Sequence, residues 1–232
     1  MRTQPLVRRP LFLAVFVAIP LASQAQGAKT IDEGSFTITV NGQRVGREDF
    51  SIAGTPTGRG TEYIAKATIV MGDRRLMPAM QADSSGAPMT YQIQTRSASD
   101  QEWWSGTISR GRVDARMRTA KGEARKEYIV TDGAIILDDD VFHQYFFVVS
   151  RVRSGSIPVV IPRRNTQLTL AIASAGPDRV TIAGKELDAT HYVLTEPSGT
   201  TRDLWVDGRG LVLKVAIPSR GVVALRDDPP AA

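Results

Sequence analysis

Apolar and polar side chains alternate along most of this chain, from Ser35 almost to the C-terminus. Successive side chains of a β-strand point to opposite faces of a sheet, so this alternation predicts strands with one dry face and one wet face. The clearest segments are 36–40 (FTITV) and 112–118 (RVDARMR). Turn residues recur roughly every 8 to 15 positions, which favours antiparallel meanders because parallel strands need long crossovers.

The first alternating segment ends at Asn41-Gly42. This pair supplies the two positive-φ residues of a tight hairpin turn, so it predicts a β-hairpin. The apolar residues of the return strand change phase between Val45 and Phe50. We therefore expect a β-bulge near Gly46, where a positive φ costs least.

One segment departs from the alternation and predicts a helix. Residues 141–152 carry apolar side chains at 141, 145, 148, 149 and 152, which is helical spacing, and further apolar residues on the remaining face predict burial. Asp138, Asp139 and Asp140 precede the segment, where they would cap free N–H groups and oppose the helix dipole. A buried strand is the alternative, because the content of aromatic and β-branched residues is high.

These patterns together predict a mostly β fold, a curved antiparallel sheet or half-barrel built of meander hairpins with one central helix. The sequence contains no internal repeat or long linker that would divide this domain. We expect a signal peptide over residues 1–25, a flexible lead-in over 26–33, a single domain over 34–228 and a disordered tail over 229–232.

The N-terminal residues have the three parts of a cleavable export signal. Three arginines and no acidic residue lead into the apolar run Leu11–Leu21, and small residues end at Ala25, after which we expect cleavage. The apolar run is shorter than the about 20 residues that a spanning helix needs, so we expect no stable transmembrane anchor.

Export to the periplasm is the favoured destination, with full secretion as the alternative. The chain has no cysteine, which excludes a lipidated N-terminal cysteine and any disulfide. Arg8-Arg9 weakly resembles a twin-arginine signal, so both the general secretory route, which we favour, and the twin-arginine route stay open.

The charge of the mature chain gives no reason to expect nucleic-acid binding. Of 29 basic residues, three lie in the export signal, which leaves 26 against 24 acidic residues. Binding to nucleic acid needs a concentrated basic face.

The sequence offers no catalytic constellation, so we expect neither catalytic residues, nor a metal, nor a cofactor. His143 and His191 are the two histidines, and their separation places no two ligands on one element. His143 follows three aspartates and could form a supported base, but a packed and hydrogen-bonded histidine is the favoured interpretation.

The remaining candidates for a binding site are aromatic and basic. Aromatic residues of a curved sheet and its helix could line an apolar pocket, although such residues also fill cores. Four arginines flank the apolar segment 157–162, where they could meet a lipid headgroup or a phosphate, or stand as solvated charges beside an edge strand. The candidate ligand-binding residues are Trp103, Trp104, Phe142, His143, Tyr145, Phe146, Arg151, Arg153, Arg163 and Arg164.

Four motifs resemble exported bacterial proteins of unknown function, of the DUF3108 and DUF6134 kind. They are F-x-I-x-V-N-G-x-x-V-G at 36–46, F-H-Q-Y at 142–145, V-I-P-R at 160–163 and L-W-V-D…G-L-V-L-K at 204–214. The last motif also resembles the final hairpin of periplasmic lipoprotein-carrier proteins. That resemblance implies a curved antiparallel half-barrel covered by helices, and no catalytic residue carries over from it. The chain departs from the carriers in having one convincing helix where they have several.

We therefore expect a non-enzymatic periplasmic protein that binds a lipid-like or other apolar molecule, or the acyl part of an envelope component. An interaction or assembly module that pairs through an exposed sheet edge with an envelope protein is the alternative. A hydrolase that uses His143 with one of the three aspartates is the second alternative.

Overall fold

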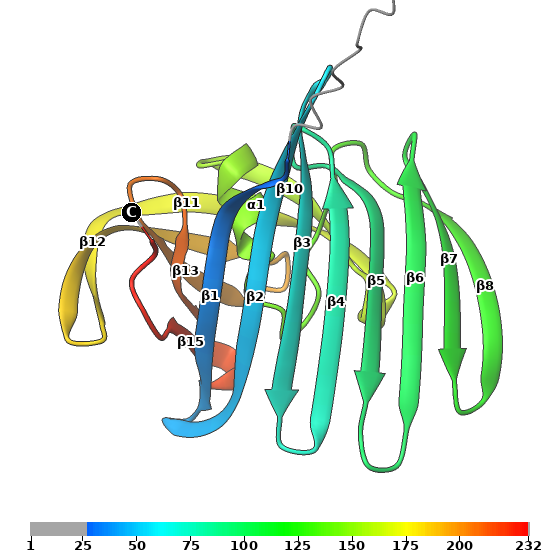
Figure 1. Ribbon diagram of the computed structural model, residues 1–232, viewed down its shortest axis with the longest axis horizontal. Coiled ribbons are helices and arrows are strands. Elements are labelled where there is room, and N and C mark those ends of the chain that lie inside the picture. The colour runs from blue at the N-terminus through cyan, green and yellow to red at the C-terminus, as the bar shows by residue number, and fades with distance from the viewer. Residues whose placement is uncertain (1–26, 232) are drawn as a thin grey trace, which may run out of the picture.

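A computed structural model describes residues 27–231 of the protein, and the expected signal peptide lies outside these residues. They form one open, curved sheet of 15 strands with a single α-helix, α1 (Tyr145–Arg151), on one of its faces (Figure 1). The predicted fold class is confirmed. None of the helices in residues 27–231 combines the length and the apolar character needed to cross a bilayer.

The strands follow the hairpin rhythm expected from the alternation. They are β1 (Lys29–Val40), β2 (Gln43–Thr57), β3 (Gly60–Met71), β4 (Arg74–Ala82), β5 (Pro88–Arg96), β6 (Gln101–Ser109), β7 (Arg112–Thr119), β8 (Gly122–Ile129), β9 (Ile135–Ile136), β10 (Gly155–Ile161), β11 (Thr166–Ile182), β12 (Lys185–Thr195), β13 (Thr201–Val206), β14 (Val212–Ile217) and β15 (Val222–Arg226). Two 3₁₀ helices, η1 (Pro162–Arg164) and η2 (Pro218–Arg220), make the turns after β10 and β14.

The first and the last strand lie side by side in the middle of the sheet. The strand order is β8-β7-β6-β5-β4-β3-β2-β1-β15-β14-β13-β12-β11-β10-β9, so the first and the last strand are neighbours. Every pair is antiparallel except β9–β10, which is parallel. The two strands at the edges of the sheet, β8 and β9, are consecutive in the chain.

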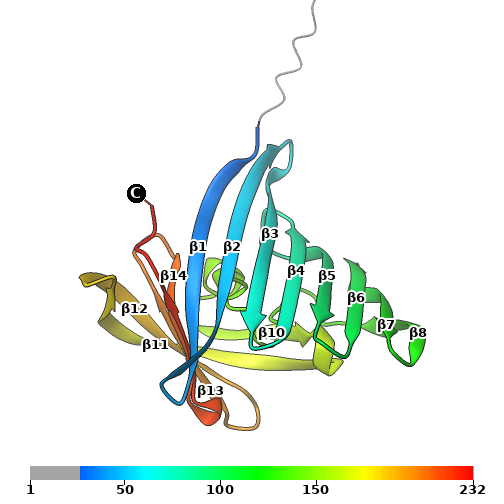
Figure 2. The ribbon, with the colours of Figure 1, turned by 60° about the horizontal axis from the view of Figure 1, so that its bottom comes forward.

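The sheet bends so that its two halves enclose the helix. Figure 2 shows β10 and β11 crossing beneath the β1–β8 half, with α1 in the angle between the halves. The helix packs on β3, where the ring of Tyr63 lies 6.2 Å from that of Phe146 and 6.0 Å from that of Phe147. The main core is continuous across both halves and the helix.

The predicted hairpin and bulge are both confirmed. Asn41 and Gly42 have φ values of 49° and 78° and turn the chain from β1 into β2. Ile38 pairs with Gly46 while Thr39 pairs with Arg44, which leaves Val45 as the extra residue of the bulge.

The expected flexible lead-in is wrong for residues 29–33, which are the first part of β1. This polar stretch pairs with β2, and its Asp32 is buried against Arg226, with oxygen–nitrogen distances of 2.7 and 3.0 Å. The stretch was not predicted as a strand because its charged residues interrupt the apolar alternation. The residue that pairs with Asp32 lies far away in the sequence, so the burial of Asp32 could not be foreseen. At the other end, residues 229–231 lie outside any helix or strand.

The predicted helix is present but shorter than expected, because it begins at Tyr145, residues 143–144 form a turn and residues 141–142 belong to no helix or strand. The predicted capping by the three aspartates is wrong. Gln144 is the N-cap residue, it makes no side-chain capping bond, and no acidic residue lies in the first helical turn. The aspartates instead bind arginines, as described next.

Candidate functional site

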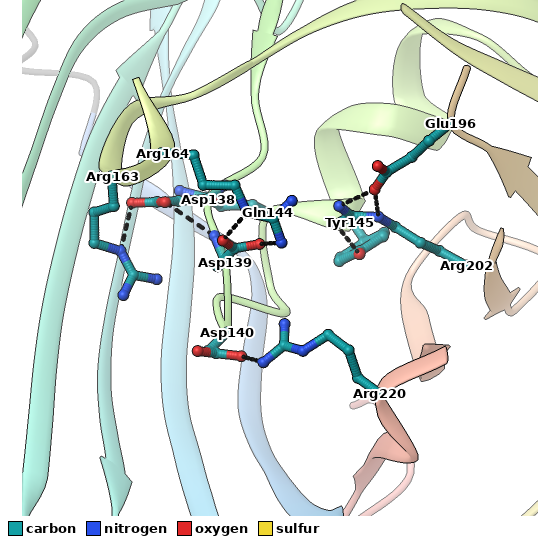
Figure 3. A network of polar contacts seen from close by, with 10 residues as sticks. All are labelled: Asp138, Asp139, Asp140, Gln144, Tyr145, Arg163, Arg164, Glu196, Arg202 and Arg220. Atoms are coloured by element: carbon teal, nitrogen blue, oxygen red, sulfur yellow. Dashed lines mark hydrogen bonds and ion pairs between the residues drawn. The ribbon is translucent and has the colours of Figure 1, made fainter. Parts of the chain in front are cut away.

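The 138–144 loop, which joins β9 to α1, is tied to the rest of the protein by three consecutive ion pairs (Figure 3). Asp138 accepts from Arg163 Nε at 3.0 Å, Asp139 accepts from Arg164 Nη2 at 2.8 Å, and Asp140 pairs with Arg220. The arginines come from η1 and η2, at the ends of β10 and β14. The loop is therefore fixed between segments that are remote in the sequence.

A fourth carboxylate, that of Glu48 in β2, also holds this loop. It is completely buried, and it accepts the backbone N–H groups of Phe142 at 2.7 Å and His143 at 3.0 Å. Its Oε1 atom also pairs with His143 Nδ1. Glu48 was not among the predicted site residues, although after the bulge position 48 shares its face with Phe50 and Ile52.

The start of α1 is anchored by a further polar contact. The Tyr145 hydroxyl accepts from Arg202 Nη1 at 3.0 Å, and Arg202 Nε donates to Glu196 at 3.1 Å (Figure 3). Burial raises the pKa of the Tyr145 hydroxyl. Burial disfavours the charged form of Arg202, but Tyr145 and Glu196 outweigh it and raise the pKa of its guanidinium.

Asp138 is a buried member of this network. Burial raises the pKa of its carboxyl group, against the opposing effects of Arg163 and of the Tyr91 hydroxyl, which donates to it at 2.9 Å. Burial together with the nearby Asp138 charge raises the pKa of Tyr91 well above its ordinary value. Burial alone would lower the pKa of the Arg163 guanidinium, but the charge of Asp138 outweighs burial and raises this pKa. The loop thus depends on a buried charge pair.

An open cleft lies beside this network on the helix side of the sheet. It has a volume of about 160 Å³ and lies between β5–β7 and η1. Ile93, Trp104, Met117 and Pro162 form its apolar wall, and Arg163 lies at its polar end. We call it the inner cleft. It brings together an apolar surface and two guanidinium groups, those of Arg163 and Arg118, and Glu102 also lines it.

The ten residues predicted to bind a ligand do not form a single site. Trp103, Trp104 and Arg163 line the inner cleft. Phe142, His143, Tyr145 and Phe146 are buried in the core, where they fill the space between helix and sheet in which the pocket was expected. Arg164 is engaged by Asp139. Arg151 and Arg153 precede β10, whereas Arg163 and Arg164 follow it, so the four arginines do not converge.

His143 occupies the environment of a packed histidine. Its side chain is 1% exposed, its ring stacks at 6.0 Å on that of Phe50, and its Nδ1 atom pairs with Glu48 rather than with an aspartate of the loop. In residues 27–231, no three or more histidine, aspartate or glutamate side chains are grouped so that they could hold a metal ion.

The fold and the network define a class of protein: an open, single-sheet β half-barrel that holds one short helix on its inner side. The F-H-Q-Y and V-I-P-R motifs meet in this network, because Arg163 binds Asp138 and the Gln144 side chain accepts the Asp138 N–H. Residues 114–225 match the family described as a domain of unknown function, DUF6134. This match confirms the expected resemblance to DUF6134 proteins over the matched residues, which make up just under half of the chain.

Among solved structures, the protein is similar to a crystal structure of a DUF1089 family protein from Pseudomonas aeruginosa. The alignment covers 89% of this chain and 95% of that chain, at 16% sequence identity and a TM-score of 0.41. A comparison with curated proteins gave no match.

Proposed function

We propose that this protein is a non-enzymatic, exported protein of the periplasm that binds an apolar or lipid-like molecule, or the acyl part of an envelope component, in the inner cleft. The observation that carries the proposal is the apolar wall of the cleft with Arg163 at its polar end. An amphiphile with an anionic head presents the complementary surface, an apolar chain next to a negative charge.

The burial of the lining residues supports this assignment. Ile93 and Trp104 are 1% and 5% exposed, so the wall of the cleft is continuous with the core. Arg163 gives its Nε to Asp138, while its Nη2 atom is buried and has no hydrogen-bond partner within residues 27–231. A buried donor without a partner is costly, and an anionic head group would satisfy it.

The size of the cleft indicates how much of a ligand it holds. Pockets that bury a whole drug-sized ligand usually measure about 300–1,000 Å³, and the inner cleft measures about 160 Å³. It therefore takes one end of a chain, and the remainder extends along the open side of the sheet.

Titration of the mature protein with dodecanoate, followed by tryptophan fluorescence, tests the proposal. Dodecanoate binds the wild type, and Met117→Lys, which places a charge in the apolar wall, lowers the affinity by about tenfold or more. Met77→Lys on the opposite face of β4 is the matched control and keeps the wild-type affinity. Absence of binding, or equal loss in both variants, would refute the proposal, and native mass spectrometry of protein purified from its own envelope would show whether a lipid accompanies it.

One observation favours the alternative of an assembly module. β8 is the edge strand of the long half of the sheet, and Ile129 at its end is 76% exposed. Free strand edges are sites for β-strand addition by a partner, although charged residues along β8 reduce nonspecific pairing. A photo-crosslinker at position 129 that captures one defined envelope protein in cells, with none captured from the control position 186, would support this function over small-molecule binding.

A further inference from the structure

The face of β3–β7 that is turned away from α1 carries a hollow of about 570 Å³. These five strands lie side by side in Figure 1. The strand register aligns one row of side chains across them, with Lys66 opposite Ala79, Ala79 opposite Gln92, Gln92 opposite Ser105, and Ser105 opposite Arg116. The row therefore has a cationic residue at each end and short or polar residues between.

The flanking rows form the two sides of this hollow, which we call the outer trough. On one side Thr90, Thr107 and Asp114 stand in register. On the other side stands Trp103. The floor is low because Ala79 and Ser105 have short side chains, so the trough runs across the strands rather than along them.

On this face of the sheet, Trp103 is a large aromatic residue that does not belong to the hydrophobic core. Its neighbour Trp104 points into the core and packs on Tyr91, whereas Trp103 is half-buried among polar residues. Trp103 also lines two further hollows, of about 590 and 570 Å³. Its indole ring thus borders three adjoining hollows as well as the inner cleft, with room for a ligand on its sides.

Among the charged residues that line the trough, the acidic one is paired with an arginine, whereas the two basic ones form no ion pair within residues 27–231. Asp114 accepts from Arg125 Nε at 2.9 Å, and this contact lowers the pKa of its carboxyl group. Within residues 27–231, neither Lys66 nor Arg116 forms an ion pair, and both side chains are exposed. The two residues stand four strands apart, or about 19 Å at ~4.8 Å per strand.

We propose that the outer trough binds an acidic oligosaccharide, a chain of sugar rings that carry carboxylates. Side-chain amides and hydroxyls, such as those of Gln92, Thr90 and Ser105, both donate and accept hydrogen bonds, as sugar hydroxyls do. The indole face of Trp103 offers an apolar surface to the C–H face of a sugar ring. Lys66 and Arg116 bind carboxylates at the two ends. The ~19 Å between them spans an extended chain rather than a single ring.

Other polymers fit this surface less well. A nucleic acid needs a concentrated row of cations along its backbone, and the trough has two that are free of ion pairs in the described residues. An apolar peptide would find few matching pockets on a floor of alanine, glutamine and serine. The trough lies on the opposite face of the sheet from the inner cleft, and Trp103 is the one residue that lines both.

Isothermal titration with a hexamer of galacturonic acid at low salt tests the site, with maltohexaose as a neutral sugar of equal length and hexaglutamate as an acidic chain without sugar rings. The galacturonate hexamer binds saturably and more weakly as salt is raised, and it binds about tenfold or more tightly than either comparison compound. No binding of the hexamer, or equal binding of maltohexaose or hexaglutamate, would overturn the proposal.

Substitutions assign the binding to the trough. Trp103→Ala and the double variant Lys66→Gln/Arg116→Gln each weaken binding of the hexamer by about tenfold or more, while Trp103→Phe, which keeps an aromatic face, retains part of it. Lys126→Gln removes one positive charge from the other face of β8 and has no effect, and neither does Met117→Lys in the inner cleft. Hexamer binding that survives both the Trp103→Ala substitution and the double substitution unchanged would show that the trough is not the site. Thermal unfolding of each variant confirms that it is folded.

Discussion

Glu48 is the residue on which the position of the 138–144 loop depends most directly. A buried carboxylate costs several kcal/mol of desolvation unless donors surround it. Glu48 has three donors, two of them backbone N–H groups that have no helical partner because they precede the first residue of α1. Its carboxylate thus replaces the hydrogen bonds that a longer helix would have made.

Replacing Glu48 with leucine therefore destabilises the protein strongly. The substitution leaves two buried N–H groups and the His143 ring without their acceptor, for which we expect a loss of about 3–5 kcal/mol in the free energy of unfolding. Urea denaturation at neutral pH measures the change. Glu62→Leu, on an exposed position of the neighbouring strand, is the control and changes the free energy by less than about 0.5 kcal/mol. A Glu48 variant as stable as this control would contradict the role described here.

Asp227 makes the stability of the protein dependent on pH in the acid range. Burial would raise the pKa of its carboxyl group, but hydrogen bonds from Thr37 at 2.6 Å and Ser35 at 2.9 Å, with the charge of Arg47, lower it overall. A carboxyl group with a lowered folded-state pKa stabilises the fold above its ordinary pKa of about 4, and this contribution is lost as the pH falls through the folded-state value.

Asp227→Asn removes this contribution. We expect the variant to be less stable than the wild type at pH 7, and the difference to shrink as the pH falls below about 4. Urea denaturation of both proteins between pH 7 and pH 3 measures it, with Asp73→Asn as a control at an exposed turn. A difference that is constant over this range would show that Asp227 does not act through its charge.

At the residue scale, some of these roles could be predicted from the sequence and others could not. The alternation placed Phe36, Ile38 and Phe50 in the core correctly. Trp103 and Trp104 were both predicted to line an apolar pocket, and both line the inner cleft, although Trp104 packs in the core and Trp103 also lines the hollow on the other face. Glu48 was missed because an acid inside an apolar row reads as an exposed position until its partners are known.

At the scale of elements, α1 is a helix that its own sequence cannot stabilise. It has seven residues, and isolated helices shorter than about 12–15 residues are marginal in water. Five of the seven residues are buried, and the turn before the helix is fixed by Glu48 and the three ion pairs. The helix therefore depends on tertiary contacts for its existence and its position.

The ion pairs of η1 provide a matched test of this dependence. Arg163→Met leaves the completely buried carboxylate of Asp138 without its guanidinium, so we expect a loss of about 3–5 kcal/mol in the free energy of unfolding. Arg164→Met breaks the adjacent, more exposed pair with Asp139 and costs about 1 kcal/mol or less. Urea denaturation compares the two variants. Equal losses would mean that burial of Asp138 does not set the strength of the pair.

The helix boundary is where prediction from sequence failed among the elements. Helical spacing begins at residue 141, but the N–H groups of 142 and 143 are taken by a glutamate almost a hundred positions earlier. The aspartates looked like helix caps because the arginines that bind them lie 25 and 80 residues away in the chain. Local patterns found the strands well because hairpins are local, and they found the helix ends poorly because tertiary contacts determine them.

At the scale of the whole molecule, the pairing of β1 with β15 joins the two halves of the sheet. Five residue pairs from Phe36–Arg226 to Val40–Val222 make this contact, and Arg226 is buried against Asp32. The backbone N–H of Asn41 also donates to the carbonyl of Gly221 at 2.8 Å. No hairpin links these strands, so the sequence predicted a meander in each half but not how the halves connect.

Truncation of the chain tests the importance of this contact. A protein that ends after Gly221 lacks β15, and we expect it to lose cooperative unfolding, because β1 and β14 no longer have their shared neighbour. A protein that ends after Asp228 keeps β15 and loses only residues outside any strand, so it should unfold with a single transition close to that of the full chain. Thermal and urea unfolding followed by circular dichroism distinguish the two outcomes. Cooperative unfolding of the shorter protein would show that each half is stable by itself.

The position of β15 has a consequence for how the chain acquires its shape. Each of the strands up to β8 can fold onto the strand that precedes it as soon as it emerges, and so can most of those from β10 to β14. The gap between β1 and β14 can be filled only when residues 222–226 arrive, which follow all the other strands of the sheet in the sequence. Closing such a long loop is slow compared with forming hairpins. Until β15 is in place, the edges of β1 and β14 are unpaired, and these two edges are where we expect a chaperone to bind a folding intermediate.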